Sequence, residues 1–282
     1  MNWLYNKNII LTGASSGIGK ELTLLLTTKY GCKVLGLART ESKLAQLKED
    51  LGDNQHLFDY YPMDIGKKEN WENLVLHLQE IQFAPDILIN NAGTMTPFEA
   101  FEKTNEEQVE KVFNTNFFSI MYGVRALLPI IKQSKTPAII NISSASALGC
   151  LPGVSIYSAS KAALKTFSEI LHCELKGQVF ISTIMPGFVK TNLFYSKDNS
   201  HDIIVQKDKK IIDFFSMKVE KAAKKIIGTI KRKKARAIIG FDAKFINFCY
   251  KLTPQTSGKF IGFVMKKSKL ETFKDVYTKK EK

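Results

Sequence analysis

The sequence predicts one α/β domain with a doubly wound, mostly parallel sheet of seven strands and helices on both faces. Short apolar runs alternate with helical stretches through the first two thirds of the 282 residues. Strands that are apolar on both faces are typical of a parallel sheet covered by helices. Right-handed crossovers between such strands produce a doubly wound fold. No repeat, low-complexity segment or linker interrupts the chain before residue 190, which favours a single domain.

The expected strands are short apolar runs bounded by glycine, proline or asparagine. The first, NIILTG, ends in a glycine turn, the third is weaker because polar residues interrupt it, and the last, RAIIG, is short. Strands are expected at 8–13, 33–38, 56–64, 86–91, 137–143, 179–187 and 236–240. Helices are expected where apolar residues recur at helical spacing, at 17–30, 41–51, 69–81, 105–133, 155–176 and 218–232.

The positive charge of the chain is concentrated near its C-terminus. Residues 1–206 hold 19 Lys or Arg and 20 Asp or Glu, whereas residues 207–282 hold 22 and 7. The whole excess of +14 therefore lies in the last quarter of the chain. A nucleic-acid enzyme more often spreads basic groups around its working site, so this distribution indicates a near-neutral body with a basic C-terminal region.

The cysteines and the apolar runs limit the cellular setting. Cys32, Cys150, Cys173 and Cys249 are scattered without metal-ligand spacing, so we expect no metal site and reduced, mostly buried thiols of a cytoplasmic protein. The first residues lack the pattern of a secretory signal. No apolar run approaches the length of a membrane-spanning helix.

The segment TGASSGIG (12–19) joins the first strand to the first helix. Gly13 permits a tight turn, Gly17 lets the backbone approach a pyrophosphate, and Gly19 allows close helix–strand packing. The N-terminus of the helix then presents free N–H groups to phosphates. The spacing is not the common G-x-G-x-x-G, and a glycine turn alone is weak evidence. Its place after the first strand favours nucleotide binding.

The segment YSASK (157–161) pairs a tyrosine with a lysine one helical turn later. Nine tyrosines and 37 lysines in this chain would give about one such pair by chance, so the motif needs support from its surroundings. A free tyrosine has a pKa near 10, too high for efficient proton exchange at neutral pH. An ammonium on the same helix face lowers the pKa of the phenol, which suits acid–base catalysis.

These motifs, with several others in order, resemble the short-chain dehydrogenase/reductase family over roughly residues 7–191. The others are Asp64 in PMD, NNAG (90–93), Asn116 in FNTNFF, NISSASALG (141–149) and PGFVKT (186–191). The resemblance implies a Rossmann-like fold and hydride transfer between a carbonyl or alcohol and a nicotinamide cofactor. Such chemistry makes the chain an enzyme acting on CH–OH donors with NAD(P) as acceptor.

The resemblance also assigns a role to each matching residue. Tyr157 exchanges the proton, Ser144 holds the substrate oxygen, Lys161 also grips the nicotinamide ribose, and Asn116 positions a water in the proton relay. Ser143 is the alternative to Ser144, but the spacing to Tyr157 favours Ser144. The implied cofactor-binding residues are Thr12, Gly13, Ser15, Ser16, Gly17, Ile18, Gly19, Arg39, Asp64, Asn91, Ala92, Gly93, Tyr157, Lys161, Pro186, Gly187, Val189 and Thr191.

Arg39 follows the second strand, whose end lies beside the adenosine ribose in this fold. A guanidinium there can pair with a 2′-phosphate, so NADP(H) is expected to be preferred over NAD(H), although NAD(H) use stays open. The position before Gly17 is Ser16, where many NADP-preferring relatives carry a basic residue. A solvated surface arginine is the alternative.

We expect residues 1–241 to form the NADP-binding and catalytic domain and 242–282 to form a basic, helical extension. Its apolar residues alternate with lysines and include Phe245, Ile246, Phe248, Tyr250, Phe260, Phe263 and Val264. They could line an entrance for a lipophilic substrate, lie on an anionic membrane, or belong to a packed helix with solvated lysines. The lysines could instead attract an acidic substrate or carrier. A substrate lid is expected at 192–215, where Phe194, Tyr195, Phe214 and Phe215 suit an apolar substrate.

The leading function is therefore an NADP(H)-dependent carbonyl reductase or alcohol dehydrogenase acting on a hydrophobic substrate. Alternatives are a 3-ketoacyl carrier reductase of fatty-acid metabolism and a non-catalytic nucleotide-binding regulator. A specific nucleic-acid partner is not expected, since no recognition motif is present. A cytoplasmic homo-oligomer, a dimer or tetramer joined through 105–133 and 155–176, is expected, with peripheral membrane association through 242–282 as a further possibility.

Overall fold

The computed structural model describes residues 3–191, 193, 204 and 207–276. Within these residues, seven strands form one sheet in the order β3-β2-β1-β4-β5-β6-β7, and every neighbouring pair is parallel. The strands are β1 (Asn8–Thr12), β2 (Lys33–Ala38), β3 (Phe58–Pro62), β4 (Ile87–Asn90), β5 (Ala138–Ile142), β6 (Phe180–Pro186) and β7 (Arg236–Ile239). The doubly wound fold expected from the sequence is confirmed.

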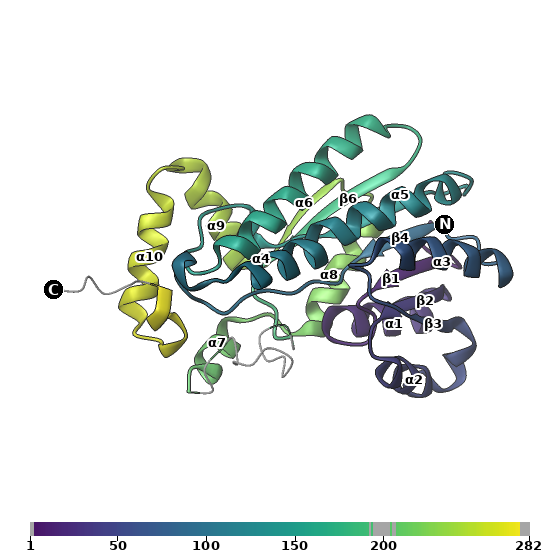
Figure 1. Cartoon of the computed structure of the whole chain (residues 1–282), viewed down its shortest axis with the longest axis horizontal. Helices are drawn as coiled ribbons and strands as arrows, with labels where there is room; N and C mark the ends of the chain where they lie inside the picture. The colour runs from purple at the N-terminus through teal and green to yellow at the C-terminus, as the bar shows by residue number, and fades with distance from the viewer. Residues whose placement is uncertain (1–2, 192, 194–203, 205–206, 277–282) are drawn as a thin grey trace.

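Helices cover both faces of the sheet (Figure 1). Apolar residues of α1, α2 and α8 pack with the strands into one core cluster, and those of α3, α5 and α6 pack into a second on the opposite face. Their bounds are α1 (Gly17–Tyr30), α2 (Glu41–Asp50), α8 (Val219–Lys231), α3 (Lys68–Glu80), α5 (Ser119–Ile131) and α6 (Ser155–Glu174). Because all strands run the same way, their carboxyl ends meet at one edge of the sheet, and the order reverses between β1 and β4.

Two elements differ from the expected ones. The long helix expected at 105–133 consists of α4 (Glu106–Phe113), a π-helical turn (Asn114–Phe118) and α5. The strand expected at 56–64 is limited to 58–62, because Gly52–Leu57 form a 3-10 turn before it. Single π turns inside α-helices often occur at functional sites.

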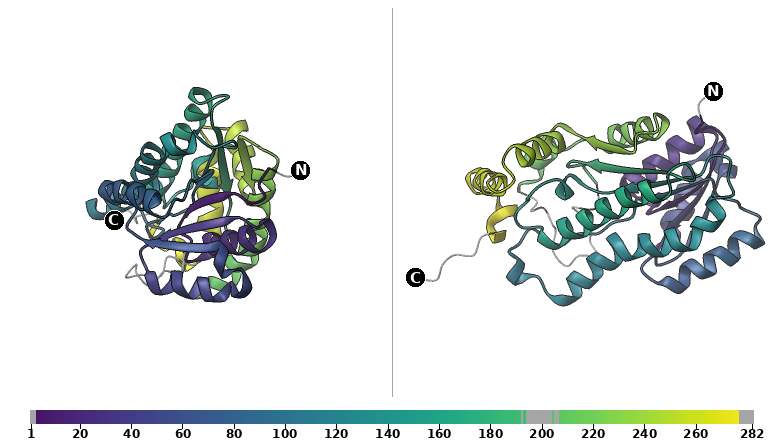
Figure 2. Two further views of the ribbon diagram at one scale, coloured as in Figure 1. Left: turned by 90° about the vertical axis from the view of Figure 1, so that its right-hand side faces the viewer. Right: turned by 90° about the horizontal axis from the view of Figure 1, so that it is seen from above.

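The C-terminal part is helical, as expected, and lies at the opposite end of the molecule from the N-terminus (Figure 2). It contains α7 (Lys209–Phe215), α9 (Phe241–Leu252), α10 (Ser257–Ser268) and a 3-10 segment, η5 (Glu271–Val276). The α9 helix packs against β7 and against the 3-10 turn Ala145–Ala147 that follows β5. None of the helices in the described ranges has the length and apolar character needed to cross a bilayer.

Candidate active site

A cavity of about 350 Å³ opens at the carboxyl ends of the strands, across the point where the strand order reverses. It brings together most of the residues expected from the sequence. Those lining it are Gly13, Ser15, Ser16, Gly17, Ile18, Arg39, Asp64, Asn91, Ala92, Gly93, Ser144, Tyr157, Lys161, Pro186, Gly187, Val189 and Thr191. Thr12, Gly19 and Asn116 lie behind its wall.

The glycine turn has the geometry of a phosphate cradle. Gly13 and Gly17 have φ of 67° and 51°, in the left-handed region that favours glycine. A Cβ on Gly19 would lie 2.0 Å from the carbonyl oxygen of Gly13, so only glycine allows the helix to approach the turn. Helix α1 has no side-chain cap and no acidic residue in its first turn. Its first N–H groups therefore face the cavity without a side-chain acceptor, and a nucleotide phosphate fits them.

The ends of β1 and β4 are joined by the Thr12 side chain. Its Oγ1 accepts hydrogen bonds of 3.0 Å from the backbone N–H groups of Asn91 and Ala92. The Asn91 amide donates in return to the Thr12 carbonyl at 3.0 Å. Thr12 is buried and does not reach the cavity, so it holds the cofactor cleft in shape instead of lining it.

The end of the cavity where the sequence predicts the adenosine ribose carries more positive charge than the sequence analysis recognised. Arg39 lines it together with Thr40 and Lys43, which lies in the first turn of α2. Lys43 follows Arg39 by four residues, and that spacing is the signal that could have found it. Asp64 also lines this end, and its Oδ1 accepts a hydrogen bond of 2.9 Å from the Gly66 backbone.

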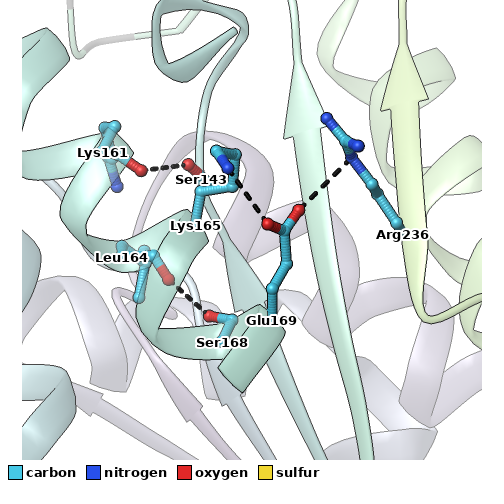
Figure 3. Close-up of polar contacts among 7 residues, drawn as sticks. All are labelled: Ser143, Lys161, Leu164, Lys165, Ser168, Glu169 and Arg236. Atoms are coloured by element: carbon cyan, nitrogen blue, oxygen red, sulfur yellow. Dashed lines mark hydrogen bonds and ion pairs between the residues drawn. The ribbon is translucent and has the colours of Figure 1, made fainter. Parts of the chain in front are cut away.

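Helix α6 carries Tyr157 and Lys161 into the cavity, where both are buried. Ser143, at the end of β5, fixes this helix by donating from Oγ to the Lys161 carbonyl at 2.8 Å (Figure 3). Ser143 therefore has a structural contact, and Ser144 is the serine whose side chain lowers the pKa of Tyr157. The Lys161 Nζ donates to the Ile142 carbonyl at 3.2 Å and lies 6.0 Å from the centre of the Tyr157 ring.

The pKa of Tyr157 differs from the expectation that Lys161 lowers it. Burial raises the pKa of the Tyr157 phenol above its ordinary value, and the hydrogen bond with Ser144 opposes that rise. Burial likewise lowers the pKa of Lys161 to about 8. The physical reason is that both groups are buried, and desolvation disfavours the charged form of each, the phenolate of Tyr157 and the ammonium of Lys161.

Asn116 sits in the π turn and is fully buried. Its amide donates to the Thr94 carbonyl at 2.8 Å and to the Ser160 hydroxyl at 3.0 Å, while its Oδ1 accepts from the Thr94 N–H at 2.9 Å. These bonds connect the π turn to the segment after β4 and to α6. Asn116 therefore lies behind Gly93 and Lys161 and not on the cavity surface.

The segment PGFVKT crosses the cavity and is fixed by a residue that sequence reasoning missed. Asp242, in the first turn of α9, accepts a hydrogen bond of 2.6 Å from the Phe188 backbone. A Cβ on Gly187 would lie 2.1 Å from this carboxylate, so Asp242 needs glycine at 187. Thr191, at the other end of the segment, lies beside Gly17, where a Cβ would come 3.4 Å from the Thr191 Cβ.

The part of the cavity beyond Tyr157 is lined mainly by apolar side chains. They come from four separate stretches and are Met95, Phe98, Leu151, Val154, Phe188, Leu193 and Ile246. Only Ile246, from the C-terminal extension, had been singled out from the sequence. Phe214, expected to suit a substrate, is 83% exposed and does not line the cavity. Phe194 and Tyr195 lie outside the described residues, and so does most of the expected lid.

Segment η5 closes the outer side of this apolar region. The Ala100 N–H donates to the Asp275 carbonyl at 2.8 Å, and Lys103 pairs with the Asp275 carboxylate at 2.7 Å. The Phe98 and Phe273 rings have centroids 5.1 Å apart. Asp208 accepts from the Thr272 N–H at 2.6 Å and from its hydroxyl at 2.8 Å. The last described residues thus tie the segment before α7 to the segment after β4.

The expectation of mostly buried cysteines is wrong. Only Cys32 is buried, Cys249 is half-buried, and Cys150 and Cys173 are exposed; all four are free thiols. Cys150 and Cys173 occupy a loop and the solvent side of a helix, positions that composition alone does not reveal.

The sequence and the fold were compared with those of known proteins. A family profile described as short chain dehydrogenase matches residues 7–202. The chain is 32% identical over 243 residues to 11-beta-hydroxysteroid dehydrogenase 1A of Arabidopsis thaliana, covering 82% of this chain and 67% of that protein. It is 32% identical over 182 residues to the NADP-dependent 3-hydroxy acid dehydrogenase YdfG of Escherichia coli, covering 64% and 72%. A short-chain dehydrogenase structure from Streptomyces avermitilis superposes with a TM-score of 0.74 at 25% identity, covering 94% and 98%.

Proposed function

Since the chain belongs to the short-chain dehydrogenase/reductase family, whose members interconvert alcohols and carbonyls with NAD(P), we propose that it prefers NADP(H) and acts on a hydrophobic substrate. The observation that carries the proposal is one cavity in which Ser144, Tyr157 and Lys161 stand between a phosphate cradle and an apolar region. The similarity to a hydroxysteroid dehydrogenase supports an apolar substrate.

The bound cofactor supplies the hydride, and the protein supplies position and a proton. In the reductive direction Tyr157 donates its phenolic proton to the substrate oxygen as the carbonyl carbon gains the hydride. Ser144 holds that oxygen and, through its bond to Tyr157, aligns donor and acceptor. The ammonium of Lys161 places a positive charge near the phenolate that forms on Tyr157, and this charge favours the phenolate. Asn116 supports this arrangement from behind through Thr94 and Ser160.

The preference for NADP(H) rests on Arg39 and Lys43 at the adenosine end. Two cations there match a 2′-phosphate, and a guanidinium pairs with it through two N–H groups. The comparison with an NADP-dependent dehydrogenase supports the same choice. We also propose that the protein forms a dimer or tetramer and that residues 242–282 associate with a membrane surface.

A panel of carbonyls and alcohols, assayed by nicotinamide absorbance with each cofactor, tests the function. It should include steroid, long-chain aliphatic, aromatic and 3-ketoacyl thioester substrates, with small polar ketones as the matched control. We expect the highest kcat/KM with NADPH and an apolar ketone, and a reversal of cofactor preference in Arg39→Asp. Equal turnover with NADH in the unaltered chain would contradict the cofactor proposal, and preference for small polar ketones would contradict the substrate class.

A further inference from the structure

Helix α9 has an outer face that no described part of the chain covers. Its inner face is buried through Ala243 and Ile246, which pack beside Ala145 next to the catalytic serine. Its outer face carries Phe241, Phe245, Phe248 and Leu252, at positions i, i+4, i+7 and i+11. They lie on one side of the helix and are 86%, 45%, 59% and 65% exposed. We name these four residues the outer stripe.

A basic groove runs directly beside the outer stripe, between α8, β7 and α9. Its charged lining is entirely positive and consists of Lys225, Arg232, Lys234, Arg236, Lys244 and Lys251. Phe241 belongs to both features, and Lys244 and Lys251 lie on the flank of α9 next to the stripe. Among the described residues, only Arg236 of these six forms an ion pair, with Glu169 at 3.4 Å (Figure 3).

The combination of features limits what can occupy this surface. Exposed aromatic residues favour an apolar phase, and the five cations that form no ion pair within the described part of the chain favour a dense array of negative charge. A second copy of the chain, meeting this surface across a two-fold axis, would place the same cations against each other. Lysines and arginines beside β7, an edge strand, also disfavour strand pairing between copies. Charge complementarity therefore selects an acidic partner that is apolar just beneath its charged surface.

We propose that the outer stripe and the basic groove dock the protein on an anionic lipid bilayer. The stripe inserts among the acyl chains at the interface, and the groove holds the phosphate headgroups, the arrangement by which amphipathic helices bind membranes. Ile246 lines the catalytic cavity from the inner face of the same helix. One helix thus separates the bilayer from the apolar region of the cavity, which suits a substrate drawn from the lipid phase.

Vesicle sedimentation of the full chain tests the charge component. Vesicles of phosphatidylcholine alone are compared with vesicles containing phosphatidylglycerol, at low and high salt. We expect binding only to anionic vesicles, reduced by salt, and reduced by about an order of magnitude or more in Lys244→Glu/Lys251→Glu. The control Lys67→Glu/Lys132→Glu changes net charge equally at exposed sites outside the groove and should bind as the unaltered chain does.

The apolar component is tested by Phe248→Ser/Leu252→Ser. The control is Leu76→Ser/Ile81→Ser, which replaces two exposed apolar residues on α3 and directly after its end. Only the α9 variant should lose binding, with the far-ultraviolet circular dichroism spectrum unchanged in both. Absence of binding to anionic vesicles at low salt, or equal loss in variant and control, would overturn the proposal. So would light scattering that shows a dimer dissociated by Phe248→Ser/Leu252→Ser, because the stripe would then be a subunit interface.

Discussion

The two ends of the cavity differ in whether backbone or side-chain groups form them. The cofactor end is formed by backbone: glycines in left-handed conformations, strand ends joined through Thr12, and the N-terminus of α1. The substrate end is formed by side chains from distant stretches and is closed by η5 through ion pairs and one buried carboxylate. The first construction tolerates few residue types, whereas the second can change its lining without changing the fold. This difference allows one scaffold to keep its cofactor while its substrate varies.

Tyr157 stands where the two ends meet, and its loss gives the largest effect. Tyr157→Phe removes the proton donor, so kcat should fall by roughly 10²- to 10⁴-fold while the Kd of the cofactor stays the same. Steady-state kinetics and a fluorescence titration of NADPH measure the two quantities. Tyr122→Phe, in a half-buried tyrosine outside the cavity, is the control and should keep full activity. Near-parental turnover of Tyr157→Phe would refute the proposed role.

Lys161 is buried beside Tyr157, and its effect on stability should depend on pH. Its pKa falls on folding from the ordinary 10.5 to about 8, so the unfolded chain binds more protons between these values and stability rises with pH there. Lys161→Met lacks this dependence. From pH 7 towards pH 10, the free energy of unfolding of the unaltered chain should therefore rise relative to that of Lys161→Met by on the order of 1–3 kcal/mol. Thermal unfolding at each pH measures this as a growing difference in Tm. A constant difference across this range would contradict a buried ammonium.

Asp208 tests whether η5 serves only the substrate end. Asp208→Ala leaves the Thr272 N–H and hydroxyl without this acceptor in a buried position, which costs about 1–3 kcal/mol of unfolding free energy. We expect a higher KM for the substrate and an unchanged Kd for NADPH. Asp208→Asn keeps an acceptor oxygen and should recover part of the loss. An equal rise in the Kd of NADPH would show that the two ends are not separable.

Lys43 gives the smallest of these effects. Its side chain is exposed, so Lys43→Ala should raise the KM for NADPH by roughly fivefold, about 1 kcal/mol, and leave the KM for NADH unchanged. Lys48→Ala, also on α2 but absent from the cavity lining, is the control. A matching change in the KM for NADH would place Lys43 outside 2′-phosphate binding.

The same contrast explains what the sequence could predict. The sheet, its helices and the cofactor residues are encoded in short stretches such as TGASSGIG and NNAG, where neighbouring residues act together. Asp242 and η5 act through partners far along the chain, which no local pattern predicts, whereas Lys43 could have been found from its spacing to Arg39. The raised pKa of Tyr157 was also missed, because sequence spacing places Lys161 nearby but does not reveal that both groups are desolvated. Burial of the cysteines could not be predicted for the same reason.

The position of η5 near the end of the sequence means that the parts of the cavity are synthesised in a fixed order. All the strands and turns around the cofactor precede it in the sequence, so a growing chain makes the nucleotide cleft well before the residues that close the substrate side. A polypeptide that stops before residue 271 would keep Gly13, Tyr157 and Thr191 but lack the partners of Asp208 and Lys103. Closure of the apolar region of the cavity therefore depends on residues that synthesis adds only after the whole nucleotide cleft.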